Sequence, residues 1–175
     1  MLVDSDTVDR TIRRMASEIL ERTGGGKKGL GLVGIRRGGK PLAERIAADM
    51  FELEGHRVPV GAVDIALYRD DAATALPDPK IGPSQIDFSV AGKDIVLVDD
   101  VLQTGRTIRA AIECLLDFGR PGRVWLAVLC DRGGRELPIS ADIVGMVLQV
   151  PDHQVVEILD DDGKWTVTTR GRGRG

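Results

Sequence analysis

The sequence has few aromatic residues, only two cysteines and almost no net charge. Aromatic side chains make up 3% of its 175 residues, so aliphatic side chains must supply most of the core packing. Cys114 and Cys130 have neither CxxC spacing nor a nearby histidine cluster, which favours buried reduced thiols over a disulfide or a metal site. The 24 basic and 27 acidic residues give a net charge of -3, which excludes a polyelectrolyte surface for nucleic acid or anionic membranes. Any anion-binding site must therefore be local.

Long apolar runs and a secretory leader are also absent from the sequence. No apolar stretch reaches the length of about 18 residues that a membrane-spanning helix needs. The first residues lack the basic-then-apolar order of a signal peptide, so we expect a cytoplasmic protein without membrane contact. The length suits one domain rather than two, and we expect a single domain over 1–169 with a flexible Arg-Gly tail over 170–175.

Helical and strand-like patterns alternate along most of the chain. Helical spacing of apolar residues recurs over 8–20, 41–55 and 104–119. Strand-like runs cover 30–35, 58–69, 95–100, 123–130 and 142–150, with a hairpin over 155–169 and a long exposed loop over 70–85. Strands that are apolar on both faces and alternate with helices predict an α/β fold. We expect a mainly parallel central sheet with helices on both faces and a closing C-terminal β-hairpin.

Two adjacent aspartates, Asp99 and Asp100, follow an unbroken apolar run and precede Thr-Gly-Arg-Thr at 104–107. Parallel sheets bind ligands at the carboxyl ends of their strands. The glycine allows close approach of the backbone, and the N–H groups at the start of the next helix can hold an anion. A carboxylate pair beside an anion site suits a ligand with both hydroxyl groups and a phosphate, such as a sugar phosphate. A helix N-cap alone would explain one aspartate but neither the second nor the glycine-threonine loop.

The stretch is neither a GxxxxGK[ST] phosphate loop nor a GxGxxG dinucleotide fingerprint. Four aliphatic residues, two acids and Thr-Gly-Arg-Thr instead resemble the 5-phosphoribosyl-1-pyrophosphate (PRPP) signature of type I phosphoribosyltransferases. Within that superfamily, "DIALYRDD", "VDDVLQTGRTIRAAIECLLDFGRP" and "LAVLCDRGGRELPISAD" closely resemble the PyrR type, bifunctional pyrimidine-operon regulators with uracil phosphoribosyltransferase activity. The resemblance covers roughly residues 6–168 and implies the type I phosphoribosyltransferase fold with a small hood.

The resemblance implies a role for each part of these motifs. As catalytic residues, Asp99 and Asp100 would bind the ribose hydroxyls, and Arg69, in a loop that matches the family's mobile flap, would contact the pyrophosphate. Arginine suits pyrophosphate because its fixed donors can bind it in a bidentate manner. Arg132 and a backbone group of Leu148 would contact the base. The resemblance implies PRPP binding by Arg36, Arg37, Val101, Leu102, Gln103, Thr104, Gly105, Arg106 and Thr107.

The implied reaction joins uracil to PRPP and gives uridine monophosphate (UMP) and pyrophosphate. Mg²⁺ would be bound mainly through PRPP rather than by a dedicated metal site of the protein. The family suggests a homodimer or homotetramer, with the first helix and exposed apolar loops as candidate interfaces. Two alternatives stay open: an RNA-binding regulator with little or no catalysis, and a phosphoribosyltransferase for another base.

The regulatory activity of that family is binding of pyrimidine-operon leader mRNA with UMP as the effector, which requires a basic surface. Several positions where the family is basic differ here: Gly134 and Ser140 replace a histidine and an arginine, and Ser17 stands where a histidine is expected in the first helix. Basic residues between Arg10 and Lys28 and the Arg-Gly tail could build a different patch. We therefore expect the enzyme activity, and we do not expect RNA attenuation to be retained.

Overall fold

The computed structural model describes residues 2–27, 29–68 and 83–173 of the chain. Its centre is a five-stranded sheet in the order β2-β1-β3-β4-β5, and every pair of neighbouring strands is parallel. The strands are β1 (Leu30–Ile35), β2 (Val60–Val63), β3 (Asp94–Leu102), β4 (Arg123–Asp131) and β5 (Ile143–Val147). The expected parallel sheet is therefore confirmed, and the strand that carries the aspartate pair is the middle one.

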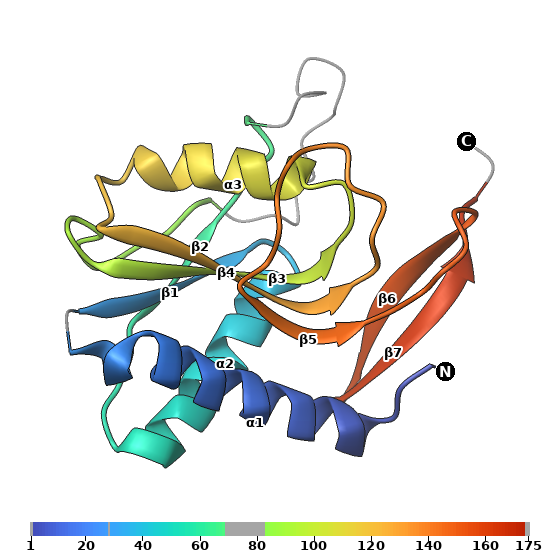
Figure 1. Cartoon of the computed structure of the whole chain (residues 1–175), viewed down its shortest axis with the longest axis horizontal. Coiled ribbons are helices and arrows are strands. Elements are labelled where there is room, and N and C mark those ends of the chain that lie inside the picture. The colour runs from blue at the N-terminus through green and yellow to red at the C-terminus, as the bar shows by residue number, and fades with distance from the viewer. Residues whose placement is uncertain (1, 28, 69–82, 174–175) are drawn as a thin grey trace.

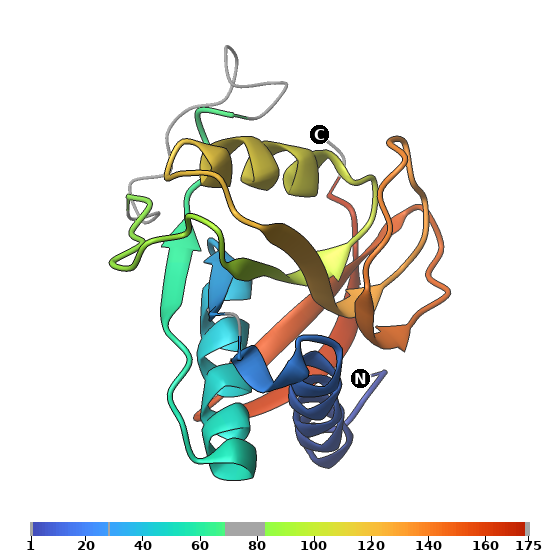
Figure 2. The same cartoon turned by 60° about the vertical axis from the view of Figure 1, so that its left-hand side comes forward.

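Helices cover both faces of the sheet (Figures 1 and 2). Helices α1 (Ser5–Arg22) and α2 (Gly39–Glu54) lie on one face, and α3 (Arg106–Leu116) lies on the other. Successive strand residues alternate between two buried cores: Val96 packs towards α1 and α2, whereas Leu97 packs towards α3. This arrangement explains why the central strands are apolar at every position rather than at every second one.

The first helix begins and ends where its sequence indicates. The Asp4 side chain accepts a hydrogen bond from the backbone N–H of Thr7 at 2.8 Å and caps the helix. That hydrogen bond lowers the pKa of Asp4. After Arg22 the chain passes through a short 3-10 turn, η1 (Gly24–Gly26), before it enters the sheet.

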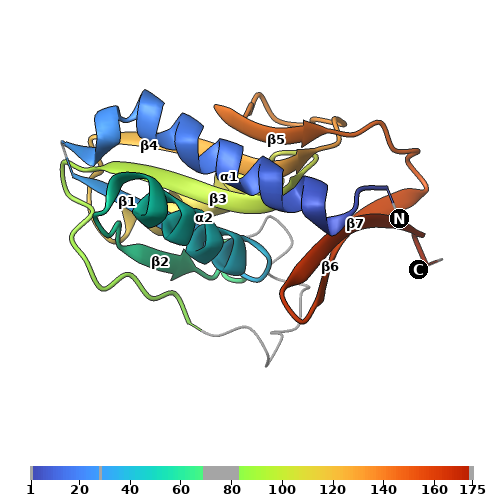
Figure 3. The same cartoon turned by 90° about the horizontal axis from the view of Figure 1, so that it is seen from below.

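The C-terminal hairpin pairs β6 (Gln154–Asp161) with β7 (Lys164–Gly171) in antiparallel register and extends beyond one end of the sheet (Figure 3). It is attached through Trp165 and Val167, which are buried in the core beneath α1 and α2. The backbone N–H of Val3 also donates to the carbonyl oxygen of Val167 at 3.1 Å. The hairpin therefore belongs to the same packed unit as the sheet.

The structure corrects three predicted boundaries. Strand β2 has four residues instead of the twelve expected over 58–69, because the chain turns after it and the N–H of Tyr68 bonds to the carbonyl of Ile65. Strand β5 ends at Val147 rather than at 150. Strand β7 continues to Gly171, so the flexible tail expected over 170–175 is wrong for its first two residues, which pair with Val155 and Gln154. Most of the loop predicted over 70–85 lies outside the described residues.

No helix in the described part of the chain is both long enough and apolar enough to cross a lipid bilayer.

Candidate active site

The aspartate pair lies at the carboxyl end of β3, where the central strand leaves the sheet. Asp99 is buried with 6% of its surface exposed, and Asp100 is half-buried. Asp99 Oδ1 accepts the N–H of Asp100 at 3.0 Å, and Asp100 Oδ1 accepts the N–H of Val101 at 2.8 Å. The backbone that follows each carboxylate thus fixes it in place, so the two acids are ordered before any ligand arrives.

Burial makes ionisation of both acids unfavourable. The pKa of Asp99 is raised well above its usual range by loss of solvent and, secondarily, by the neighbouring charge of Asp100. Loss of solvent also raises the pKa of Asp100. Neither carboxylate forms an ion pair with a basic side chain in the described part of the chain. A ligand that brings hydroxyl donors or a cation to this point would relieve the unfavourable charge.

The loop between β3 and α3 forms an open cavity of about 220 Å³ beside the acid pair. Gly105 has the left-handed φ of +90°, a conformation that glycine adopts without strain, and α3 begins at the next residue. The Thr104 hydroxyl accepts the N–H of Arg106 at 3.2 Å, which closes the turn. The cavity is lined by Asp99, Val101, Leu102, Gln103, Thr104, Gly105, Thr107 and Ile108. A helix N-terminus that opens into such a cavity suits a phosphate group.

The segment Arg36-Arg37-Gly38-Gly39 packs directly against the acid pair from the end of β1. A Cβ atom added to Gly38 would collide with the carboxylate of Asp100, and one added to Gly39 would collide with the backbone carbonyl of Val98. Arg36 is half-buried, and its Nε is buried with no hydrogen-bond partner among the described groups. The peptide bond between Arg36 and Arg37 is cis. The two glycines therefore bring the arginine loop into contact with the acids.

Arg132, predicted to contact a base, has a different environment from the one expected. It is 8% exposed, and its guanidinium donates to the backbone carbonyls of Gln154 at 2.6 Å, Pro151 at 3.3 Å and Val150 at 3.4 Å. In this structure Arg132 braces the segment between β5 and β6. The half-buried Leu148 lies in that region, and its N–H donates to the carbonyl of Asp131 at 2.8 Å. Base contacts by Arg132 and Leu148 stay predictions.

Sequence reasoning missed a second pair of residues that shapes this region. The Arg135 guanidinium forms a bidentate pair with Asp131, at 2.9 and 2.6 Å, and this pairing lowers the pKa of Asp131. Arg135 also donates to the carbonyls of Gln103 at 3.0 Å and Ile139 at 2.7 Å. It therefore fastens the segment after β4, residues 132–139, to the loop between β3 and α3, residues 103–105, which we call the phosphate loop. The spacing of an acid and an arginine four residues apart in "DRGGR" was the available signal.

Comparison with known proteins places this geometry in a family. The model of the phosphoribosyl transferase domain matches residues 2–159, which include both loops and the acid pair. The chain belongs to the phosphoribosyltransferase family. It is 57% identical to the bifunctional protein PyrR of a Roseiflexus species over 82% of this chain and 78% of that protein. It is also 50% identical to the bifunctional protein PyrR of Thermus aquaticus, over 90% and 86% of the two chains.

Solved phosphoribosyltransferases share the fold at much lower identity. The hypoxanthine phosphoribosyltransferase of Trypanosoma cruzi superimposes with a TM-score of 0.70 at 17% identity, over 98% of this chain and 97% of that one. A hypoxanthine-guanine phosphoribosyltransferase of Bacillus anthracis gives a TM-score of 0.64 at 18% identity, over 89% and 85% of the chains. These similarities confirm the type I phosphoribosyltransferase fold and go no further than the fold.

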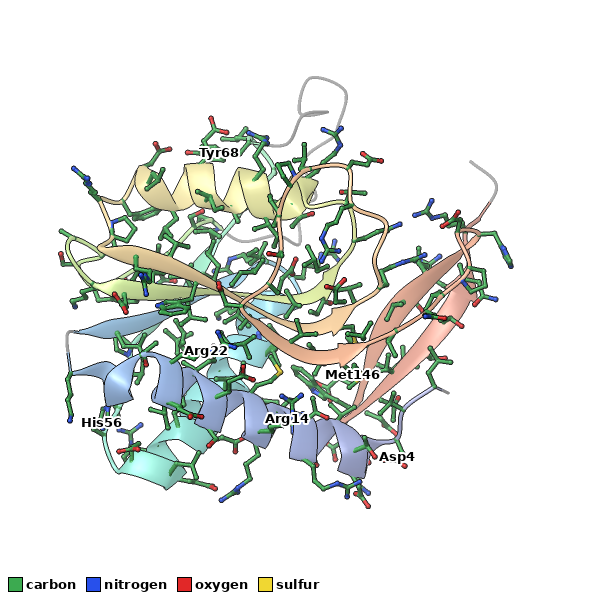
Figure 4. All side chains as sticks on the ribbon, viewed as in Figure 1. Asp4, Arg14, Arg22, His56, Tyr68 and Met146 are labelled. Atoms are coloured by element: carbon green, nitrogen blue, oxygen red, sulfur yellow. The ribbon has the colours of Figure 1, made fainter. Side chains whose placement is uncertain are left out.

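Arg69 lies outside the described residues, but the residue before it is well anchored. The Tyr68 hydroxyl bonds to the carboxylate of Asp117, which raises the pKa of Tyr68 to about 12, and the Tyr68 carbonyl accepts from the guanidinium of Arg109. Figure 4 shows Tyr68 above α3. On the other side of residues 69–82, which the structure does not describe, the Ser84 hydroxyl accepts the N–H of Asp64 at 2.7 Å. The segment that carries Arg69 in this phosphoribosyltransferase thus starts and ends at fixed points beside α3 and β2.

The described residues contain no cluster of three or more histidine, cysteine, aspartate or glutamate side chains that could hold a metal ion. The acid pair nevertheless offers hard oxygen donors of the kind that Mg²⁺ prefers. Two carboxylates whose ionisation is opposed by burial would also gain from a nearby cation. The acid pair therefore suits a site in which a magnesium ion, bound mainly through a substrate and water, lies close to the carboxylates.

Proposed function

We propose that this phosphoribosyltransferase transfers the phosphoribosyl group of PRPP to uracil, giving UMP and pyrophosphate. The observation that carries the proposal is the junction of β3 and α3, where a buried acid pair adjoins a glycine turn and a helix N-terminus. Those groups match the diol and the 5′-phosphate of one ribose phosphate. The choice of uracil is supported by the resemblance to PyrR-type proteins and by relatives named bifunctional protein PyrR.

In the proposed reaction the bond between the anomeric carbon and pyrophosphate breaks while a bond to N1 of uracil forms, and N1 loses its proton. Asp99 and Asp100 would accept hydrogen bonds from the ribose hydroxyls and lie near the positive charge that develops on the sugar. The backbone N–H groups of 101–107 would hold the 5′-phosphate. Positioning of this kind can lower a barrier by about 7–11 kcal/mol. We assign no general base, because both acids are committed to the sugar.

The leaving pyrophosphate would meet Arg36, Arg37 and Arg69. The buried Nε of Arg36, which lacks a partner among the described groups, supports this role because an anion would satisfy it. Mg²⁺, when bound with PRPP, would neutralise part of the pyrophosphate charge. Closure of the site would keep out water that could hydrolyse the donor.

A competition assay tests the proposed function. The purified chain is given PRPP, Mg²⁺ and equal amounts of uracil, adenine, guanine and orotate, and the nucleotides formed are separated and counted. We expect UMP as the main product. A purine nucleotide or orotidine monophosphate as the main product would overturn the choice of acceptor but retain the donor site. Failure to consume PRPP with any base would overturn catalysis as a whole.

Regulation by leader RNA is a second candidate with less support. Of the three α1 arginines considered for a basic patch, Arg13 pairs with Glu52 at 3.2 Å and Arg14 pairs with Glu18 at 3.5 Å, whereas Arg10 donates to the Thr7 hydroxyl at 3.0 Å. Arg22, at the end of the same helix, also pairs with Glu18 at 3.0 Å. Figure 4 marks Arg14 and Arg22 along this helix. These pairs reduce the positive charge available to a phosphate backbone. Titration with labelled leader RNA at a stated salt concentration, with and without UMP, tests this activity, and we expect weak binding that UMP does not strengthen.

The oligomeric state, a homodimer or homotetramer, stays a prediction.

A further inference from the structure

Arg172, the first residue after β7, has no role in the site as described above. Its backbone N–H donates to the carbonyl of His153 at 2.8 Å, one position beyond the last pair of the hairpin. Its guanidinium Nη2 lies 3.3 Å from Oε1 of Gln103, although the two residues are 69 positions apart. The carboxyl end of β7 therefore lies beside the phosphate loop (Figure 2).

The phosphate loop itself provides little positive charge. Asp99 is the one charged residue among the described residues that line the 220 Å³ cavity, and none of them is a lysine or an arginine. The nearby arginines are already paired with acids: Arg106 with Glu136 at 2.7 Å, and Arg135 with Asp131 at 2.6 Å. Arg172 forms no ion pair with a carboxylate in the described part of the chain. Its charge is therefore not neutralised by an acid of the described chain.

The contact with Arg172 also determines what the Gln103 side chain can offer. A glutamine amide carries an acceptor oxygen on one arm and two N–H donors on the other, whereas a guanidinium can only donate. Arg172 thus holds Oε1 of Gln103 towards itself, and the N–H arm points elsewhere. The backbone carbonyl of Gln103 is occupied as well, by Arg135 at 3.0 Å. With both of its oxygens bound to arginines, Gln103 has only the N–H donors of its side chain left to offer.

We propose that Arg172 is a positioning residue of the donor site: it fixes the Gln103 amide as a hydrogen-bond donor to the 5′-phosphate of PRPP and places a positive charge beside that phosphate. The inference rests on the proposed function, since it takes PRPP as the ligand. It gives the start of the Arg-Gly tail, whose composition suggested disorder or RNA contact, a part in substrate binding.

Calorimetric titration of the full chain with PRPP and with ribose 5-phosphate, both with Mg²⁺, tests the inference. We expect Arg172→Gln to raise the Kd of both ligands about three- to tenfold, as for loss of one exposed charged hydrogen bond. Arg172→Lys keeps the charge and a donor, so it should recover part of the affinity. The control is Arg170→Gln, which removes an exposed arginine of β7 that pairs with Glu157 of β6, and it should leave both Kd values unchanged.

Two further measurements separate positioning from a general structural effect. In steady-state assays Arg172→Gln should raise the KM for PRPP by the same factor and change kcat by less than about twofold, because it removes binding rather than a group at the reacting atoms. Gln103→Met removes the acceptor, so the loss of binding free energy in the double variant Gln103→Met/Arg172→Gln should be smaller than the sum of the two single losses. Fully additive losses would show that Arg172 does not act through Gln103 and would overturn positioning.

The titration separates this inference from the proposed function, because PRPP binding does not require the acceptor base. If the wild-type chain forms no UMP, the uracil assignment fails, and the Kd comparison still decides the role of Arg172. Equal Kd values for wild type and Arg172→Gln would overturn the inference. The same holds if Arg172→Gln binds PRPP normally but loses affinity for leader RNA, which would assign the tail to RNA instead.

Discussion

The proposed donor end and the proposed base end of the site differ in the partners that surround their charged side chains. At the proposed donor end, Asp99 is buried and Asp100 is half-buried, neither has a basic partner in the described part of the chain, and loss of solvent raises the pKa of both. At the proposed base end, Arg135 is paired with Asp131. Arg132 donates to three backbone carbonyls, and its Nε has no hydrogen-bond partner among the described groups. Acids without a basic partner suit a place where a ligand completes the structure, whereas the Asp131–Arg135 ion pair holds loops in place.

Asp100→Asn is the strongest test of this difference, because it removes one of the two uncompensated acids without changing the shape of the side chain. We expect UMP formation to fall at least about 10²-fold, since a carboxylate near the developing positive charge is lost. The circular dichroism spectrum and Tm should stay close to those of the wild type. Asp94→Asn is the matched control at the opposite end of β3, where the Asp94 carboxylate accepts from the Trp125 indole at 3.3 Å. An unchanged rate constant in folded Asp100→Asn would contradict the role of the acid pair.

Gly38→Ala tests whether the arginine loop must touch the acids. The new Cβ would collide with the Asp100 carboxylate, so either the loop or the acid has to move. We expect kcat/KM to fall about 10- to 100-fold, because small displacements at a positioning site are costly. In Gly173→Ala the added Cβ has no heavy atom within 4 Å, and this control should retain the wild-type rate. Equal rates for the two variants would show that the close contact is not required.

Arg132→Met tests the proposed base end. We expect this substitution to lower the free energy of unfolding rather than kcat. Removing a buried guanidinium that donates to three carbonyls should lower the free energy of unfolding by about 2–4 kcal/mol, measured by urea denaturation. At temperatures where the variant is folded, the KM for uracil should rise more than the KM for PRPP. Arg123→Met, at the exposed start of the same strand, should cost less than about 1 kcal/mol. A stable Arg132→Met variant with a collapsed kcat would instead indicate direct contact with the base.

Asp99→Asn and Asp131→Asn should affect stability with opposite signs. The pKa of Asp99 is raised above its usual value of 3.8, so its contribution to stability is complete below that value and is lost as pH rises through the folded-state pKa. Asn does not titrate, so Asp99→Asn should gain Tm relative to wild type as pH rises. The pKa of Asp131 is lowered, so its contribution is present above 3.8 and is lost as pH falls through the lowered pKa. Asp131→Asn should therefore lose Tm at neutral pH and approach wild type in acid.

These variants are compared by measuring Tm between pH 3 and pH 9. One result would contradict the expectation. If both substitutions lowered Tm at neutral pH by similar amounts, the two aspartates would not differ in how their charge is compensated. These effects are the smallest of the series, because each concerns one titrating group in a fold with two separate cores.

The sequence predicted the strand-loop-helix unit of the proposed donor end well because its signals are local. Apolar runs, the adjacent aspartates and the glycine before α3 are contiguous, and the strand-loop-helix unit they define is observed at 94–116. The parallel sheet followed from the same kind of local pattern. Boundaries such as the end of β7 were missed, because backbone pairing with β6 outweighs the disorder that an Arg-Gly composition suggests.

The base end could not be predicted in the same way, because its contacts are non-local. Arg132 donates to the carbonyls of Val150, Pro151 and Gln154, and backbone carbonyls carry no residue-specific signal in a sequence. The contact between Arg172 and Gln103 depends on how the whole hairpin lies against the sheet. The family resemblance implied one arginine, Arg132, near a base, whereas the structure shows that its guanidinium braces the segment between β5 and β6.

A crystal structure of the chain with bound UMP tests the donor site most directly. We expect the 5′-phosphate in the 220 Å³ cavity, within hydrogen-bond distance of the backbone N–H groups between Thr104 and Thr107, and the ribose hydroxyls on Asp99 and Asp100. A phosphate bound elsewhere, or a ribose that does not touch either aspartate, would contradict the assignment of the acid pair and its loop as the donor site.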